Sequence, residues 1–168
     1  YSEIPDVGLY LEQVTRYLNE YITGIGCAEI TPSMISNYVK KGIIRSPQKK
    51  QYFADQIAFL MFISIIKNVL PLENIVKLFE MRRDKYTVQQ AYDYFCSEFE
   101  NMVYFVFGVT DEAEPDLGFS KTEEKYFLRN VIISAAHSLY ISAYFAKLKE
   151  QSPEKRPAIA LMSSVDNP

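Results

Sequence analysis

Five basic side chains occupy a stretch of eleven residues that contains no acidic residue. They are Lys40, Lys41, Arg45, Lys49 and Lys50. Such a run is typical of a solvated, lysine-rich turn, but cations gathered in one place also bind phosphate groups. The choice between a solvated turn and a phosphate-binding surface depends on the local structure that holds these side chains.

The charge along the chain is uneven, although the protein of 168 residues has a formal net charge of only −3. Residues 29–85 carry ten basic and five acidic side chains. Residues 1–28 carry one basic and four acidic side chains, and residues 86–168 carry seven basic and twelve acidic side chains. The basic run therefore lies in the segment with net positive charge. Because nucleic-acid binding depends on where the cations lie, the acidic total does not exclude it.

Helix signals surround the basic run. Thr31 is typical of an N-cap, Pro32 suits the first helical position and Gly42 suits the residue after a helix, so we predict a helix over 31–41. The following residues, 45–52, have the length of a tight hairpin with basic residues at its tip. The outward face of the predicted helix carries Ser33, Ser36 or Asn37, and Lys40.

Apolar residues at helical spacing predict further helices over about 8–22, 54–68, 71–83, 87–107 and 120–150. The 54–68 helix is apolar on nearly every face, so other elements must cover it on several sides. Six glycines against 13 tyrosines and 11 phenylalanines disfavour a turn-rich sandwich or barrel. We therefore predict an all-α fold with a small β wing. Its parts are a winged domain over 1–85, a helical region over 86–150 and a loose tail over 151–168.

The residues from Ile30 to Glu80 resemble the DNA-binding half of MerR-type winged helix-turn-helix regulators. The matching motif has three parts. A recognition helix ends in Tyr-x-x-x-Gly and two aliphatic residues. A wing that closes with Tyr follows it, and a later helix starts with Leu-x-x-Ile. Its residues here are Tyr38, Gly42, Ile43, Ile44, Tyr52, Leu72 and Ile75.

A closer resemblance is to the bacterial domain-of-unknown-function family 1836. That family has an Ile-Pro-Asp…Leu-Tyr motif followed by a Thr-x-x-Met-x-x-Asn-Tyr helix. The corresponding residues here are Ile4, Pro5, Asp6, Leu9 and Tyr10, then Thr31, Met34, Asn37 and Tyr38. Together the two resemblances cover about residues 4–80.

The MerR resemblance implies a transcriptional regulator that binds double-stranded DNA, with the 31–41 helix in the major groove and the wing on phosphates. The candidate DNA-binding residues are Ser33, Ser36, Asn37, Lys40, Lys41, Arg45, Lys49 and Lys50. Ser36 stands where MerR regulators usually carry an arginine, and Phe53 stands where a Ser or Asp N-cap is usual. Asn37 is then the best candidate for reading an adenine edge.

A second function is also compatible with the sequence, namely a helical module that binds protein through the winged fold without specific DNA binding. The missing arginine and the acidic total favour it. We do not expect an enzyme, a metal site or a cofactor, because the single histidine, His137, lies in an apolar helix and no Gly-rich phosphate loop is present. Cys27 and Cys96 lack CxxC spacing, which argues against a disulfide framework and fits a reducing, cytoplasmic location.

The C-terminal helices carry consecutive apolar residues, such as Val131–Ile133 and Leu139–Ile141, that need cover on two sides. We expect a homodimer to supply it. The alternative is a monomer whose C-terminal helices fold back on the 54–68 helix. The aromatic residues of these helices either form core or line a pocket for a small-molecule effector. No leader segment is visible and the longest apolar block, Ile57–Ile66, is shorter than the ~18 residues a membrane span requires, so we expect a soluble protein.

Overall fold

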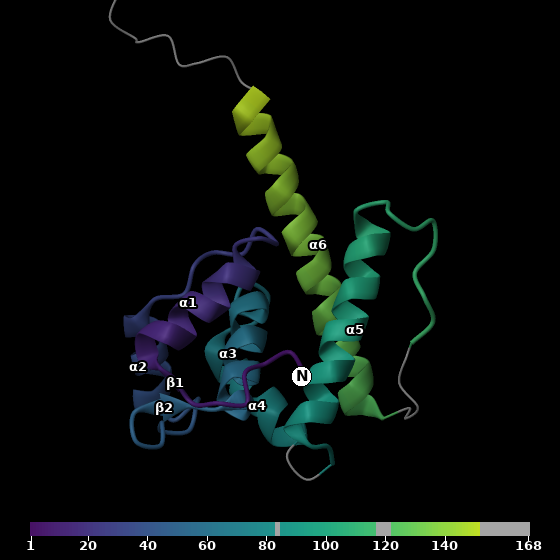
Figure 1. The fold of residues 1–168 in the computed structure, drawn as a ribbon. Helices are drawn as coiled ribbons and strands as arrows, with labels where there is room; N and C mark the ends of the chain where they lie inside the picture. Colours follow the sequence, from purple (N-terminus) through teal and green to yellow (C-terminus); the bar gives the residue numbers. More distant parts are fainter. Residues whose placement is uncertain (83–84, 117–121, 152–168) are drawn as a thin grey trace, which may run out of the picture.

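The computed structural model describes residues 1–82, 85–116 and 122–151, which are mostly helical with one two-stranded sheet. The elements in chain order are β1 (Leu9–Tyr10), α1 (Leu11–Ile22), α2 (Pro32–Lys40), β2 (Gln51–Tyr52), α3 (Ala54–Ile66), α4 (Leu72–Arg82), α5 (Val88–Val106) and α6 (Glu123–Gln151). Figure 1 shows α1, α2 and the sheet on one side of α3, and α5 and α6 on the other. The predicted all-α class with a small β element is confirmed.

The prediction of a helix from residue 8 was wrong at its start, because α1 begins at Leu11. The two preceding residues form β1, in which Leu9 pairs with Tyr52 and Tyr10 with Gln51 in an antiparallel arrangement. The close approach of the two strands requires Gly8, since a Cβ there would lie 2.9 Å from the Cβ of Gln51. The spacing of apolar residues within 8–22 could not predict this strand, because its partner β2 lies more than forty residues away in the sequence.

The other predicted helices are confirmed to within three residues at each described end. Arg83, residues 120–121 and all but the first residue of the predicted tail 151–168 lie outside the described part of the chain.

Both ends of α2 have the predicted caps. The Thr31 hydroxyl accepts a hydrogen bond of 3.2 Å from the Met34 N–H, and Pro32 follows at the first helical position. At the other end Gly42 has φ +71°, and the N–H groups of Gly42 and Ile43 donate to the carbonyls of Val39 and Tyr38. This pattern is a Schellman motif, which only a residue free to adopt positive φ closes without strain.

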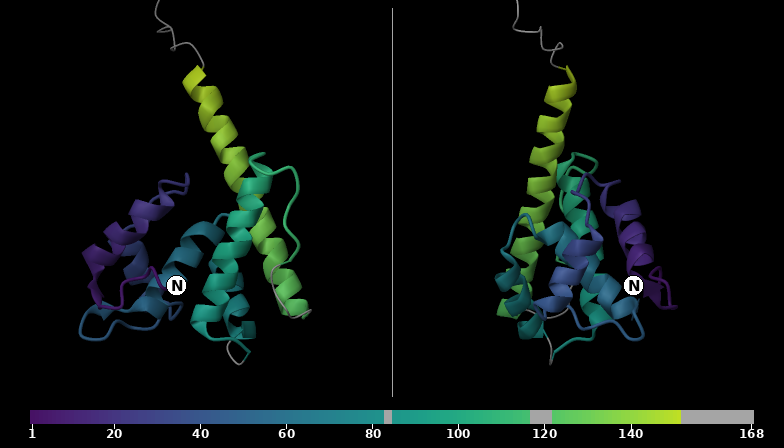
Figure 2. Two further views of the ribbon diagram at one scale, coloured as in Figure 1. Left: turned by 45° about the vertical axis from the view of Figure 1, so that its right-hand side comes forward. Right: turned by 90° about the vertical axis from the view of Figure 1, so that its left-hand side faces the viewer.

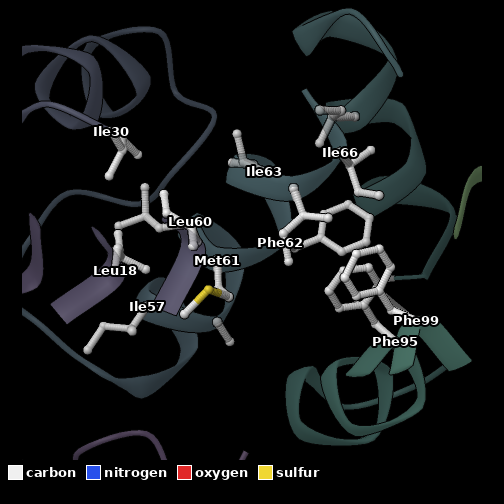
Figure 3. Close-up of a cluster of buried hydrophobic side chains, with 14 of the residues drawn as sticks. Leu18, Ile30, Ile57, Leu60, Met61, Phe62, Ile63, Ile66, Phe95 and Phe99 are labelled. Atoms are coloured by element: carbon white, nitrogen blue, oxygen red, sulfur yellow. The ribbon is translucent and has the colours of Figure 1, made fainter. Parts of the chain in front are cut away.

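The core of the protein is built around α3. Ten of its thirteen residues are buried, and α1, α4, α5 and α6 all pack against it. Leu18 and Ile30 contribute side chains on one side of α3, and Phe95 and Phe99 on the other (Figure 3). Ser64, the polar residue in this apolar run, is satisfied because its hydroxyl donates to the Leu60 carbonyl at 2.8 Å. The prediction that this helix is covered on several sides is confirmed.

The first half of α6 lies along α5 (Figure 2). The apolar residues Val131, Ile132, Ala135 and Ala136 of α6 are buried. Glu98 of α5 is fully buried, and its Oε1 accepts a hydrogen bond of 2.7 Å from Arg129 Nε. Removing Arg129 would leave the buried Glu98 carboxylate without its cation, so this contact helps to fix how α6 sits on α5.

Asn19 of α1 holds the start of α2 in place. Its side-chain amide donates to the Ile30 carbonyl at 2.9 Å and accepts from the Ile30 N–H at 2.9 Å, as a neighbouring strand would do. Ile30 is 1% exposed and directly precedes the N-cap Thr31. This amide therefore ties the residue before α2 to α1, in addition to the direct packing of the two helices.

We expect Asn19→Ala to lower the free energy of unfolding by about 1–3 kcal/mol, because it leaves two backbone groups of a buried residue unpaired. Urea unfolding followed by circular dichroism measures the change. Asn74→Ala is the matched control: Asn74 is exposed on α4, so its loss changes stability by less than about 0.5 kcal/mol. Equal stability of the two variants would contradict the role given to Asn19.

Candidate nucleic-acid interface

All eight residues predicted from the sequence to contact DNA are exposed. Ser33, Ser36, Asn37 and Lys40 belong to α2, Lys41 is its C-cap, and Arg45, Lys49 and Lys50 lie in the segment that leads to β2. In Figure 1, α2 and this segment lie next to one another, on the side of the molecule away from α5 and α6. We call residues 45–52 the wing.

One face of α2 is polar and the opposite face is anchored in the core. Ser33, Asn37 and Lys40 follow one another at spacings of four and three residues, which places them on one side of a helix. Ile35 and Tyr38 are buried on the other side, with exposed fractions of 0% and 4%. Burial raises the pKa of the Tyr38 hydroxyl, so this anchor is neutral. The polar face is held outward because the apolar face is fixed.

The tip of the wing is a two-residue hairpin turn. Gln48 and Gln51 exchange backbone hydrogen bonds of 3.0 and 2.8 Å across it, which leaves Lys49 and Lys50 at the tip. Both lysines have positive φ, 49° and 66°, as a type I′ turn requires. The predicted hairpin with basic residues at its tip is confirmed.

The turn chemistry at the tip is unusual. Asn-Gly is the preferred pair for a type I′ turn, because a side chain in the left-handed region costs roughly 1–2 kcal/mol per residue. Lys49 and Lys50 both adopt that region without glycine. Strained backbone of this kind clusters at functional sites, and here it holds two lysine side chains at the end of a hairpin.

Gln56 connects the wing to the core helix. Its carboxamide accepts from the Phe53 N–H at 3.0 Å and donates to the Arg45 carbonyl at 2.9 Å. Phe53 occupies the N-cap of α3 and cannot cap it with its own side chain, so Gln56 supplies one side-chain acceptor at this helix start. Gln56 is 9% exposed. The wing therefore moves with α3.

The five cations of this surface are not neutralised within the described part of the chain. No ion pair of Lys40, Lys41, Arg45, Lys49 or Lys50 occurs among residues 1–82, 85–116 and 122–151. Two lysines further along the chain differ, since Lys85 pairs with Glu124 and Lys125 with Asp116 at 2.8 Å. A surface with exposed, unpaired cations on two adjoining elements is suited to phosphate groups.

Sequence reasoning missed the two amides that position this surface, Asn19 and Gln56. Their roles depend on backbone groups eleven residues away, and no motif in the sequence marks them. Tyr52, in contrast, closes the wing as predicted and is buried, which raises the pKa of its hydroxyl.

The remaining reactive residues lie away from the interface. Burial raises the pKa of the Cys27 and Cys96 thiols, which therefore stay protonated. His137 is exposed on α6. Across the described residues, no group of three or more His, Cys, Asp and Glu side chains is placed to hold a metal ion.

Residues 1–95 match the family described as domain of unknown function (DUF1836), and this match spans more than half of the chain. The protein belongs to this family. The matched segment contains the whole candidate interface and continues into the first turns of α5, beyond the domain boundary predicted at residue 85. Comparison with curated proteins and with solved structures gave no match.

Proposed function

We propose that this protein is a DNA-binding transcriptional regulator of MerR-like winged helix-turn-helix type. In this proposal α2 enters the major groove with Ser33, Asn37 and Lys40 toward the bases, and the wing places Lys49 and Lys50 on phosphates. The supporting observation is that a polar helix face and a strained basic hairpin adjoin one another, with cations that have no acidic partner among the described residues.

The end of the wing is tied to the rest of the domain, because β2 pairs with the short segment before α1. Ser36 in place of the usual arginine favours the second candidate, a winged module that binds protein. The two candidates differ in one measurable property, because phosphate binding weakens steeply with salt.

Replacing Lys49 and Lys50 by Asn and Gly should weaken binding to any duplex and reduce the slope of log affinity against log salt by about two, one for each lost phosphate contact. The Asn-Gly pair suits the type I′ turn better than the lysines do, so a loss of affinity cannot come from an unfolded wing. Fluorescence anisotropy with a mixed-sequence duplex at several salt concentrations measures both quantities.

The charge-matched control for this variant is Lys67→Gln with Lys77→Gln, which removes two lysines outside the wing, from the end of α3 and from α4. We expect it to bind like the unaltered protein. Equal effects of the two double variants would contradict a specific role of the wing. Failure of the unaltered protein to bind duplex DNA in a salt-dependent manner would favour the protein-binding module.

Asn37→Ala should reduce discrimination between a selected site and random DNA by about 1–3 kcal/mol, because it removes the amide proposed to read an adenine. Sites selected from a random duplex pool supply the specific ligand. Asn74→Ala, on α4, should leave discrimination unchanged. A parallel fall of specific and non-specific affinity in Asn37→Ala would instead make Asn37 a residue that positions the helix.

The proposed regulator is a homodimer through the second half of α6. Residues 141–149 are exposed and extend beyond the rest of the molecule (Figure 1). Ile141, Tyr144, Phe145 and Leu148 are 42–57% exposed and lie at spacings of three, one and three residues, which forms one apolar stripe. A second copy of the stripe, related by a two-fold axis, would cover it.

Two other interpretations of α6 compete with the dimer. The C-terminal helices do fold back on α3, so the dimer is not needed to cover that helix. By length and composition, Glu123–Lys149 is also apolar enough to cross a membrane. However, the part beyond Tyr140 is about ten residues, or ~15 Å of helix, which is half of a bilayer core. The rest of α6 packs on α5 through Arg129 and Glu98.

Light scattering at micromolar concentration should give the mass of two chains, and Phe145→Glu should give the mass of one, because it places a charge in the apolar stripe. Ala146→Glu is the matched control, since residue 146 is exposed on another side of α6 and should leave the dimer intact. A mass of one chain for the unaltered protein, independent of concentration, would exclude the dimer.

A further inference from the structure

A cavity of about 660 Å³ lies where the family-matched segment meets the C-terminal helices. Among the described residues, its walls come from α3, α4, residues 85–86, α5 and α6. The hollow is partly open to solvent rather than a closed interior void. Its volume falls within the 300–1,000 Å³ range that is typical of small-molecule sites.

The walls are mainly apolar and aromatic. Phe59 and Phe79 form one side, with ring centroids 4.4 Å apart, and Phe62 lies 5.3 Å from Phe79. Tyr92 and Leu128 contribute from α5 and α6. Flat rings at the wall favour a ligand with an aromatic or otherwise apolar body, which they contact by offset or edge-to-face packing.

The charged side chains that line the cavity sum to no net charge, and most of them form ion pairs. Among the described residues, four lysine or acidic side chains line the cavity: Lys85, Asp93, Glu124 and Lys125. Lys85 pairs with Glu124, and Lys125 pairs with Asp116 while lying 5.3 Å from the Tyr94 ring centroid. Both lysines of the described lining therefore already have an acidic partner, which favours an uncharged ligand over an anion.

We propose that this cavity is a binding site for an uncharged, mainly aromatic small molecule. Its occupant would touch α3 and α4 on one side and α5 and α6 on the other, and so would hold the two parts of the chain together. Ligand binding here does not depend on whether the protein binds DNA, so the two proposals fail or succeed separately.

The test uses N-phenyl-1-naphthylamine, an uncharged aromatic probe, and the full chain. We expect a saturable rise in fluorescence with one site per chain. Ala91→Phe, which fills the cavity from α5, should weaken binding at least ten-fold, whereas Ala28→Phe, an exposed position outside the lining, should not change it. Equal binding by the two variants, or binding that does not saturate, would overturn the proposal.

A comparison of two probes on the unaltered protein tests the ligand class without any substitution. 8-Anilino-1-naphthalenesulfonate has the same ring system with an added sulfonate. We expect it to bind at least ten-fold more weakly than the uncharged probe, because Lys85 and Lys125, the two lysines of the described lining, already have acidic partners. Equal or tighter binding of the sulfonate would show that the site takes anions.

Discussion

The burial of α3 on all sides is the constraint on which the other elements depend. Its Ile, Leu, Met and Phe side chains point in several directions, and each buried one contributes about 1.5–3 kcal/mol when it is removed from water. No single neighbour can cover such a helix. The chain therefore places α1 and α2 on one side and α5 and α6 on the other, so that the two parts share one core (Figure 3).

The interface is rigid because polar contacts tie it to this core. Asn19 fixes the residue before α2, and Gln56 fixes the first residue of the wing to the first turn of α3. The same helix supplies Phe59 and Phe62 to the wall of the cavity. The candidate interface and the cavity wall therefore share α3 as a common element.

Much of the local structure around the interface could be predicted from the sequence. Thr31, Pro32 and Gly42 determine both ends of α2, because caps act on backbone groups within a few residues. The length of the wing and the positions of its lysines likewise follow from the chain itself. The apolar character of residues 54–66 required a helix covered on several sides before any neighbour was known.

Contacts between distant segments were decided only by the tertiary structure. Leu9 and Tyr10 continue the helical apolar pattern, yet they form a strand because Gln51 and Tyr52 offer a free edge. The aromatic residues of the C-terminal helices were compatible with core or with a pocket, and only the packing of four helices leaves the cavity between them. Sequence pattern determines which face of an element is apolar, since that depends on spacing within the element. Which element packs on that face depends on competition among all the elements of the folded chain, so the spacing of apolar residues alone does not predict it.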